Sequence, residues 1–95
     1  MNRKTYIHVT DHALDRYRKR KKSISYKNAI RKIVAGIQNS RLIGFAKGNK
    51  REIREHRGSI YVCSYNEYKN RIDVITVLNS KAELRFDEDL ALQSI

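Results

Sequence analysis

The chain has 95 residues, which leaves room for a single domain over residues 1–95, because a domain usually takes roughly 100–150 residues. Lys and Arg number 21 against 10 Asp and Glu, so the formal net charge is +11, and the 40% of residues that are hydrophobic suffice for one modest core. The single cysteine, Cys63, excludes an internal disulfide and a four-cysteine zinc site.

The first predicted elements are a short strand over residues 6–9 and a helix over residues 12–22. Thr10 and Asp11 stand before this helix, and a side-chain oxygen there can accept a hydrogen bond from the first free backbone N–H groups. Apolar residues recur inside the helix at helical spacing, beside a stripe of His and Arg. We therefore expect one face to pack and the next to be cationic.

A second helix is predicted over residues 26–38, with Ser23 or Ser25 as its N-cap. Its apolar residues recur at steps of three and four, which is the clearest amphipathic pattern in the chain. Lys27 and Arg31 fall on the outward side and add to the positive charge.

The pattern then changes from a helical period to a strand period of two. Strands are predicted over residues 41–47, 51–57, 60–65 and 71–78. Segment 51–57 carries too many alternating charges for a central strand, so we expect it at an exposed edge. Segments 60–65 and 71–78 are apolar on both sides and belong to the sheet centre.

The C-terminal residues fit a last strand over residues 81–86 and a short helix over residues 87–93. The order of elements predicts an α+β fold, in which two N-terminal helices pack on a four- to five-stranded antiparallel sheet.

The positive charge is concentrated in the first half of the chain. Residues 1–57 hold 17 Lys and Arg against 4 Asp and Glu, whereas residues 58–95 hold 4 against 6. Such a concentration repels itself unless a polyanion neutralises it, which favours a nucleic acid over a merely solubilising surface or an acidic membrane headgroup layer. Tyrosines interleaved with basic residues favour single-stranded RNA. The residues expected to contact it are Arg18, Lys19, Lys22, Lys27, Arg31, Arg54, Tyr61 and Tyr65.

The segment TDHALDRYRKR holds the residues best suited to chemistry. His12, Arg16 and Arg20 follow at i, i+4 and i+8, so they share one stripe of the first helix. An imidazole can move a proton during phosphodiester cleavage, and guanidinium groups can hold the phosphate. His56 and Thr76, on later strands, are expected to complete a catalytic site.

Each of these residues also has a structural interpretation. His12 follows a helix cap, and the arginines fit a solvated face. His56 suits an exposed edge, Thr76 is a common strand residue, and Tyr61, Tyr65 and Cys63 suit sheet packing.

Several function classes have no sequence support. Metal-ligand spacing, a phosphate-binding glycine loop and a dinucleotide fingerprint are all missing, so we expect no cofactor and no metal. No apolar run approaches the roughly 20 residues of a membrane-spanning helix, and the first residues lack the apolar stretch of a signal peptide. We therefore expect a cytoplasmic protein without a membrane partner.

The spacing His12-Ala13-x-x-Arg16-x-x-x-Arg20, the amphipathic second helix and the late strand over residues 72–78 resemble the small H-A-x-x-R proteins of bacteria, phages and mobile elements. That group belongs to the barnase/EndoU/colicin/RelE-like fold of small ribonucleases and toxins. The resemblance covers roughly residues 6–79.

The resemblance implies a metal-independent ribonuclease with two helices on a four-stranded antiparallel sheet. Its functional residues fall on His12, Arg16, Arg20 and Thr76. RelE-like toxins that cleave mRNA on the ribosome place basic and tyrosine residues near the C-terminus, whereas this chain has the acidic run 87–89 there.

The sequence therefore predicts a small basic RNA-directed protein, a metal-independent endoribonuclease of toxin or phage type. The alternative is a non-catalytic phage or prophage regulator that binds nucleic acid or an acidic host protein. For a toxin, an acidic antitoxin is the expected protein partner.

Overall fold

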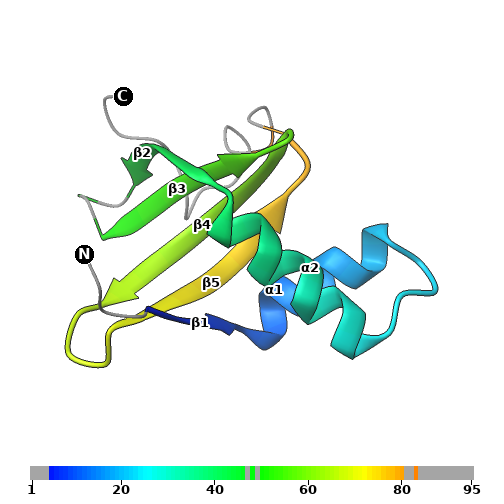
Figure 1. Cartoon of the computed structure of the whole chain (residues 1–95). Coiled ribbons are helices and arrows are strands. Elements are labelled where there is room, and N and C mark those ends of the chain that lie inside the picture. Colours follow the sequence, from blue (N-terminus) through cyan, green and yellow to red (C-terminus); the bar gives the residue numbers. More distant parts are fainter. Residues whose placement is uncertain (1–4, 47, 49, 81–82, 84–95) are drawn as a thin grey trace.

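The computed structural model describes residues 5–46, 48, 50–80 and 83. Figure 1 shows two helices lying together against one side of a twisted sheet, which confirms the α+β class. The elements in chain order are β1 (Tyr6–Val9), α1 (Asp11–Arg20), α2 (Tyr26–Gln38), β2 (Arg41–Ala46), β3 (Arg51–His56), β4 (Ser59–Asn66) and β5 (Arg71–Leu78).

The sheet is mixed, in the order β1-β5-β4-β3-β2. Strands β2 to β5 form an antiparallel meander, but β1 pairs with β5 in parallel, so the expectation of a wholly antiparallel sheet is wrong. Both helices lie between β1 and the meander in the chain, and such a long connection permits a parallel pair. Strand hydropathy alone carries no signal for the direction of pairing.

The charged strand β3 lies inside the sheet, between β4 and β2, and is not the predicted edge. Its charges are tolerated because they pair locally: Arg54 Nε lies 3.0 Å from Glu52 Oε1. Ile53, between them, points to the opposite face and is fully buried. The inner position of the apolar strands β4 and β5 is as predicted.

Both helices begin at predicted caps. The Thr10 hydroxyl accepts a hydrogen bond from Ala13 N at 3.2 Å, and the Ser25 hydroxyl accepts one from Asn28 N at 3.2 Å. Helix α2 has the predicted bounds, whereas α1 ends at Arg20, before the expected residue 22. No helix in the described part of the chain is long and apolar enough to cross a membrane.

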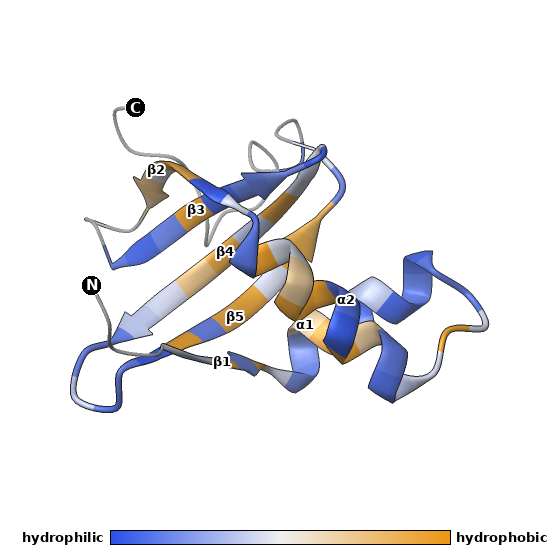
Figure 2. Cartoon of the chain, in the orientation of Figure 1, coloured by the Kyte–Doolittle hydropathy of each residue, from blue (hydrophilic) through white to orange (hydrophobic). Residues whose placement is uncertain are grey.

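Two hydrophobic clusters lie on opposite faces of the sheet. In Figure 2 the hydrophobic part of β5 lies under the helices, where one cluster is formed. Its buried members are Ala13, Leu14, Ala29, Ile33, Ile37, Tyr61, Cys63, Val74 and Val77. The buried members of the cluster on the other face are Ala46, Ile53, Ile60, Val62 and Leu78.

Helix α2 packs against Tyr61 of β4 at Gly36. A Cβ atom at position 36 would lie 2.7 Å from Tyr61 Cζ, which is closer than real side chains approach. Only glycine therefore leaves room for the hydroxyl end of the Tyr61 ring at this turn of the helix. The predicted strand over 81–86 and helix over 87–93 lie outside the described residues, apart from residue 83.

Candidate nucleic-acid interface

The stripe His12, Arg16 and Arg20 runs along α1, which packs on β5. Arg20 is committed to the fold. Its Nη1 donates to the carbonyl oxygen of Val77 at 2.9 Å, and its Nη2 donates to Glu83 Oε2 at 2.7 Å. Arg20, which the sequence predicted to bind a phosphate, thus connects α1 to the end of β5.

The reason is the short length of β1. The pairing of β1 with β5 ends at Val9 and Val74, while β5 continues to Leu78. Beyond Val74, the β5 carbonyl groups on this side need other donors. The Thr10 hydroxyl lies 2.8 Å from Val74 O and 3.2 Å from Ile75 O, and Arg20 supplies the donor for Val77. Residues at the two ends of α1 therefore donate hydrogen bonds to β5 carbonyl groups along the edge that β1 leaves unpaired.

Glu83 is a site residue that the sequence analysis missed. Its carboxylate lies 3.9 Å from Arg16 Nη2 and accepts from Arg20, while its other oxygen accepts from Asn79 N at 3.3 Å. This places a carboxylate next to the His12 stripe and neutralises part of its positive charge. No signal pointed to it, because 63 residues separate Glu83 from Arg20.

His12 and Thr76 do not share a site. His12 is exposed in the first turn of α1. Thr76 pairs with Val62 of β4, so its side chain points to the face opposite the helices. It is 2% exposed, and its hydroxyl has no hydrogen-bond partner among the residues that the structure describes. The sheet separates it from α1, and the catalytic role predicted for Thr76 has no geometric support.

The other predicted strand residues are scattered. Tyr61 is 4% exposed under Gly36, and burial raises its pKa, so it is a core residue and not a platform for bases. His56 and Arg54 lie on β3, which β4 separates from the β5 strand beneath α1. Tyr65 is exposed, but its hydroxyl donates to Asn70 Oδ1 at 3.0 Å near the far turn.

Burial also removes Cys63 as a nucleophile. The thiol is fully buried in the cluster beneath the helices, and desolvation raises its pKa to about 12. At neutral pH it stays protonated, so the interpretation as a packing residue is confirmed. In the part of the chain that the structure describes, no three His, Cys, Asp or Glu side chains are grouped to hold a metal ion.

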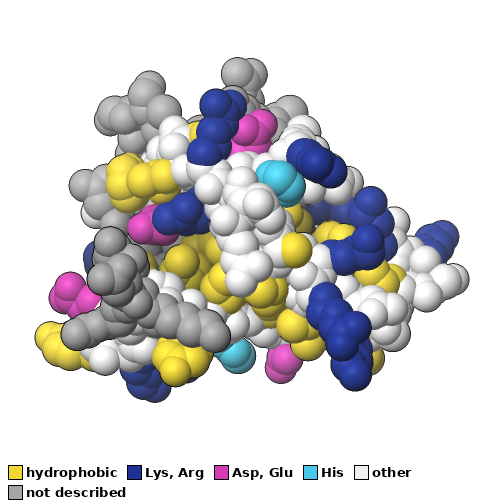
Figure 3. All heavy atoms as spheres, viewed as in Figure 1, with side chains coloured by type: hydrophobic (Ala, Val, Ile, Leu, Met, Phe, Trp, Pro, Cys, Tyr) yellow, Lys and Arg dark blue, Asp and Glu magenta, His cyan; other side chains and the backbone are white. Residues whose placement is uncertain are grey.

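A continuous basic segment forms the outer side of the helices. Residues 16–32 hold nine Lys and Arg and no Asp or Glu. Blue side chains gather over the helices in Figure 3, on the side away from most of the acidic ones. We call the following residues the basic helical surface: Arg18, Lys19, Lys21, Lys22, Lys27, Arg31 and Lys32. All of them except Arg18 are exposed.

The turn between the helices orders one part of this surface. The Arg18 guanidinium lies 3.7 Å above the ring centroid of Tyr26, and its Nε donates to Ile24 O at 3.2 Å. An open hollow of about 360 Å³ lies beside this stack. Its lining residues are Asp15, Arg18, Lys19, Lys22 and Ser23. Tyr26 is one of the apolar residues whose spacing predicts α2, and sequence spacing does not show that Arg18 reaches it.

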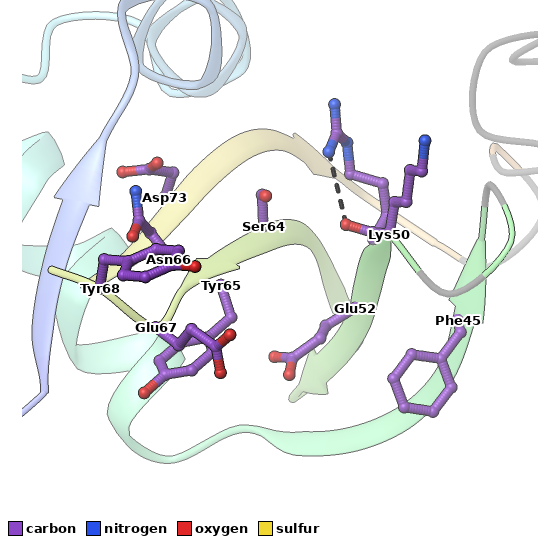
Figure 4. Close-up of a pocket in the computed structure, with 10 residues that line it drawn as sticks. Phe45, Lys50, Glu52, Ser64, Tyr65, Asn66, Glu67, Tyr68 and Asp73 are labelled. Carbon is purple, nitrogen blue, oxygen red and sulfur yellow. Dashed lines mark hydrogen bonds between the residues drawn. The ribbon is translucent and has the colours of Figure 1, made fainter. Parts of the chain in front are cut away.

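A larger hollow of about 650 Å³ lies at the far end of the sheet. Figure 4 shows Ser64 and Asp73 on one side of the strands and Glu52 and Tyr65 on the other. Its charged lining is mixed, with Lys50 and Arg51 facing three carboxylates. It therefore lacks the uniform positive charge of the basic helical surface.

Comparison with protein-family profiles, with curated proteins and with solved structures gives no match.

Proposed function

We propose that the chain binds RNA through the basic helical surface. The observation that supports this most directly is the uninterrupted cationic segment over residues 16–32, whose side chains mostly stay exposed in the fold. Lysines and arginines gain affinity from phosphates by releasing counterions. The lone buried Cys63 is compatible with a reducing cytoplasm. In this proposal, an acidic antitoxin or host protein would compete with RNA for the same surface.

A metal-independent endoribonuclease of toxin or phage type is the second candidate. One observation favours it: Arg16 and Arg20 hold the Glu83 carboxylate beside the stripe that begins with His12. An imidazole and a carboxylate are the groups that general acid–base cleavage needs, and Arg16 could hold a phosphate. This candidate also retains the proposed relation to RelE-like ribonucleases. Thr76 and Tyr61 have no part in it.

Binding is tested by fluorescence anisotropy with a labelled RNA over a range of salt concentrations. We expect log K to fall linearly with log salt. The Lys19→Gln/Lys22→Gln double variant should bind more weakly, with the slope reduced by about 1 for each lysine that contacts a phosphate. The control is Lys50→Gln/Lys69→Gln, which removes two exposed lysines outside the surface. A salt-insensitive affinity, or equal losses in both double variants, contradicts the proposal.

Catalysis is tested separately by incubating total cellular RNA with the native chain and with His12→Ala in EDTA. Cleavage that falls on the order of 100-fold or more in the variant assigns the acid–base role to His12. RNA binding without fragments from the native chain eliminates the ribonuclease candidate and leaves the binding proposal intact.

A further inference from the structure

We infer that the stacked pair Arg18 and Tyr26 makes the basic helical surface selective for single-stranded RNA, by holding one unpaired base next to one phosphate. This inference rests on the proposed function and goes beyond it, because a uniform layer of positive charge binds duplex and single strand alike.

The stack of Arg18 on Tyr26 is well ordered. A surface arginine is usually mobile, but the Arg18 guanidinium is held by the Tyr26 ring on one side and by the carbonyl of Ile24 at one end. The cation–π contact and the hydrogen bond fix the plane of both groups. A fixed plane is what a stacking partner needs, because less side-chain freedom is lost on binding.

One side of the Tyr26 ring is accessible to a ligand. Tyr26 is the first residue of α2 and remains 55% exposed although Arg18 covers it from one side. An unpaired base can lie on the open side and complete a stack of base, ring and guanidinium. In a duplex the base faces are covered by their neighbours in the helix, so the ring has nothing to stack on.

The hollow beside the stack is lined mostly by cations. Arg18, Lys19 and Lys22 place three cations around it, against the single carboxylate of Asp15. Ser23 adds a hydroxyl, and its φ of 72° turns the chain sharply at this point. The volume of about 360 Å³ lies in the range of small-ligand sites. A backbone phosphate therefore fits here, within reach of the nucleotide whose base stacks on Tyr26.

The inference is tested with a labelled 12-nucleotide oligouridine and a 12-base-pair RNA duplex. Replacing Tyr26→Leu should weaken oligouridine binding about 5- to 150-fold, the range that corresponds to losing one base–aromatic stack. Duplex binding should change less than about twofold, since the lysines remain. Tyr26→Phe keeps the ring and should retain single-strand binding.

The matched control is Tyr68→Leu, which removes a tyrosine that is 96% exposed on the turn after β4. It should leave both affinities unchanged. Equal losses for oligouridine and duplex in Tyr26→Leu, or no loss in either, overturn the inference while the binding proposal stands. A native chain that binds neither RNA overturns the proposed function itself. Circular dichroism spectra of the variants should match the native spectrum, because both side chains lie on the surface.

Discussion

The Arg20 guanidinium donates to the backbone carbonyl of Val77 at 2.9 Å, at a position where a longer β1 would have supplied a backbone N–H. Replacing Arg20→Ala removes the side-chain donor to this carbonyl and the donor 2.7 Å from Glu83 Oε2. We expect the free energy of unfolding to fall by about 1.5–3 kcal/mol, the usual range for hydrogen bonds to charged groups. Urea titration measures the change, and Arg31→Ala, which removes an exposed arginine of α2, is the control. An Arg20→Ala variant as stable as the native chain would refute this structural role.

The packing of Gly36 on Tyr61 predicts an effect opposite to the usual one. Gly→Ala inside a helix normally stabilises by about 1 kcal/mol, but here the added methyl group overlaps the tyrosine ring. Gly36→Ala should therefore destabilise the chain by about 1–3 kcal/mol, as overpacking does. Thermal unfolding measures it. Tyr61→Phe removes the hydroxyl nearest to the new methyl group and should recover part of the loss in the double variant.

The unpartnered hydroxyl of Thr76 predicts a stabilising substitution. Thr76→Val replaces a buried oxygen, which has no hydrogen bond within the described part of the chain, by a methyl group of similar shape. The free energy of unfolding should rise by about 1 kcal/mol, because the desolvation cost of the hydroxyl disappears. Thr76→Ser keeps the hydroxyl, loses the methyl group and should be less stable. Loss of RNA cleavage in a stable Thr76→Val variant would instead restore the catalytic role that the sequence suggested.

The raised pKa of Cys63 predicts a dependence on alkaline pH. In the unfolded chain the thiol ionises near its ordinary pKa of 9.0, whereas in the fold it ionises near 12. Between these values the unfolded chain loses a proton that the folded chain keeps, so stability falls as pH rises above 9. In Cys63→Ala this part of the decline should vanish. Iodoacetamide at pH 8 should modify the thiol only after urea unfolding, and rapid labelling of the native chain would contradict its burial.

The sequence predicted most elements because their signals are local. Both caps and the exact bounds of α2 and β5 follow from side-chain chemistry and periodicity within each segment. The position of β3 and the direction of β1 were wrong, because they depend on pairing between distant segments. The alternating charges indicated an edge position for β3. In the structure the strand lies inside the sheet, and Arg54 forms an ion pair with Glu52.

The sequence predicted which basic residues lie on the surface of the candidate site, but it did not predict the contacts among the site residues. The basic residues of the helices lie on the surface as expected, since helical spacing alone separates outward from inward positions. Sequence spacing gave no means of knowing that Arg20 would bind a strand carbonyl or that Glu83 would reach it. The stack of Arg18 on Tyr26 was equally hidden, because it depends on the turn between the helices.

The parallel pair of β1 and β5 also predicts the order in which the elements assemble. The Thr10 hydroxyl meets Val74 across 64 residues of chain, whereas β2 to β5 join through short hairpins. Closing a long loop costs more entropy than closing a hairpin, so we expect the meander to form early and β1 to dock late. Hydrogen exchange should accordingly find the β1 amides opening at lower free energy than those of β4. Strand β1 therefore helps to hold α1 on the sheet. A partner that displaced β1 would weaken the contact of α1 with β5 while leaving β2 to β5 paired.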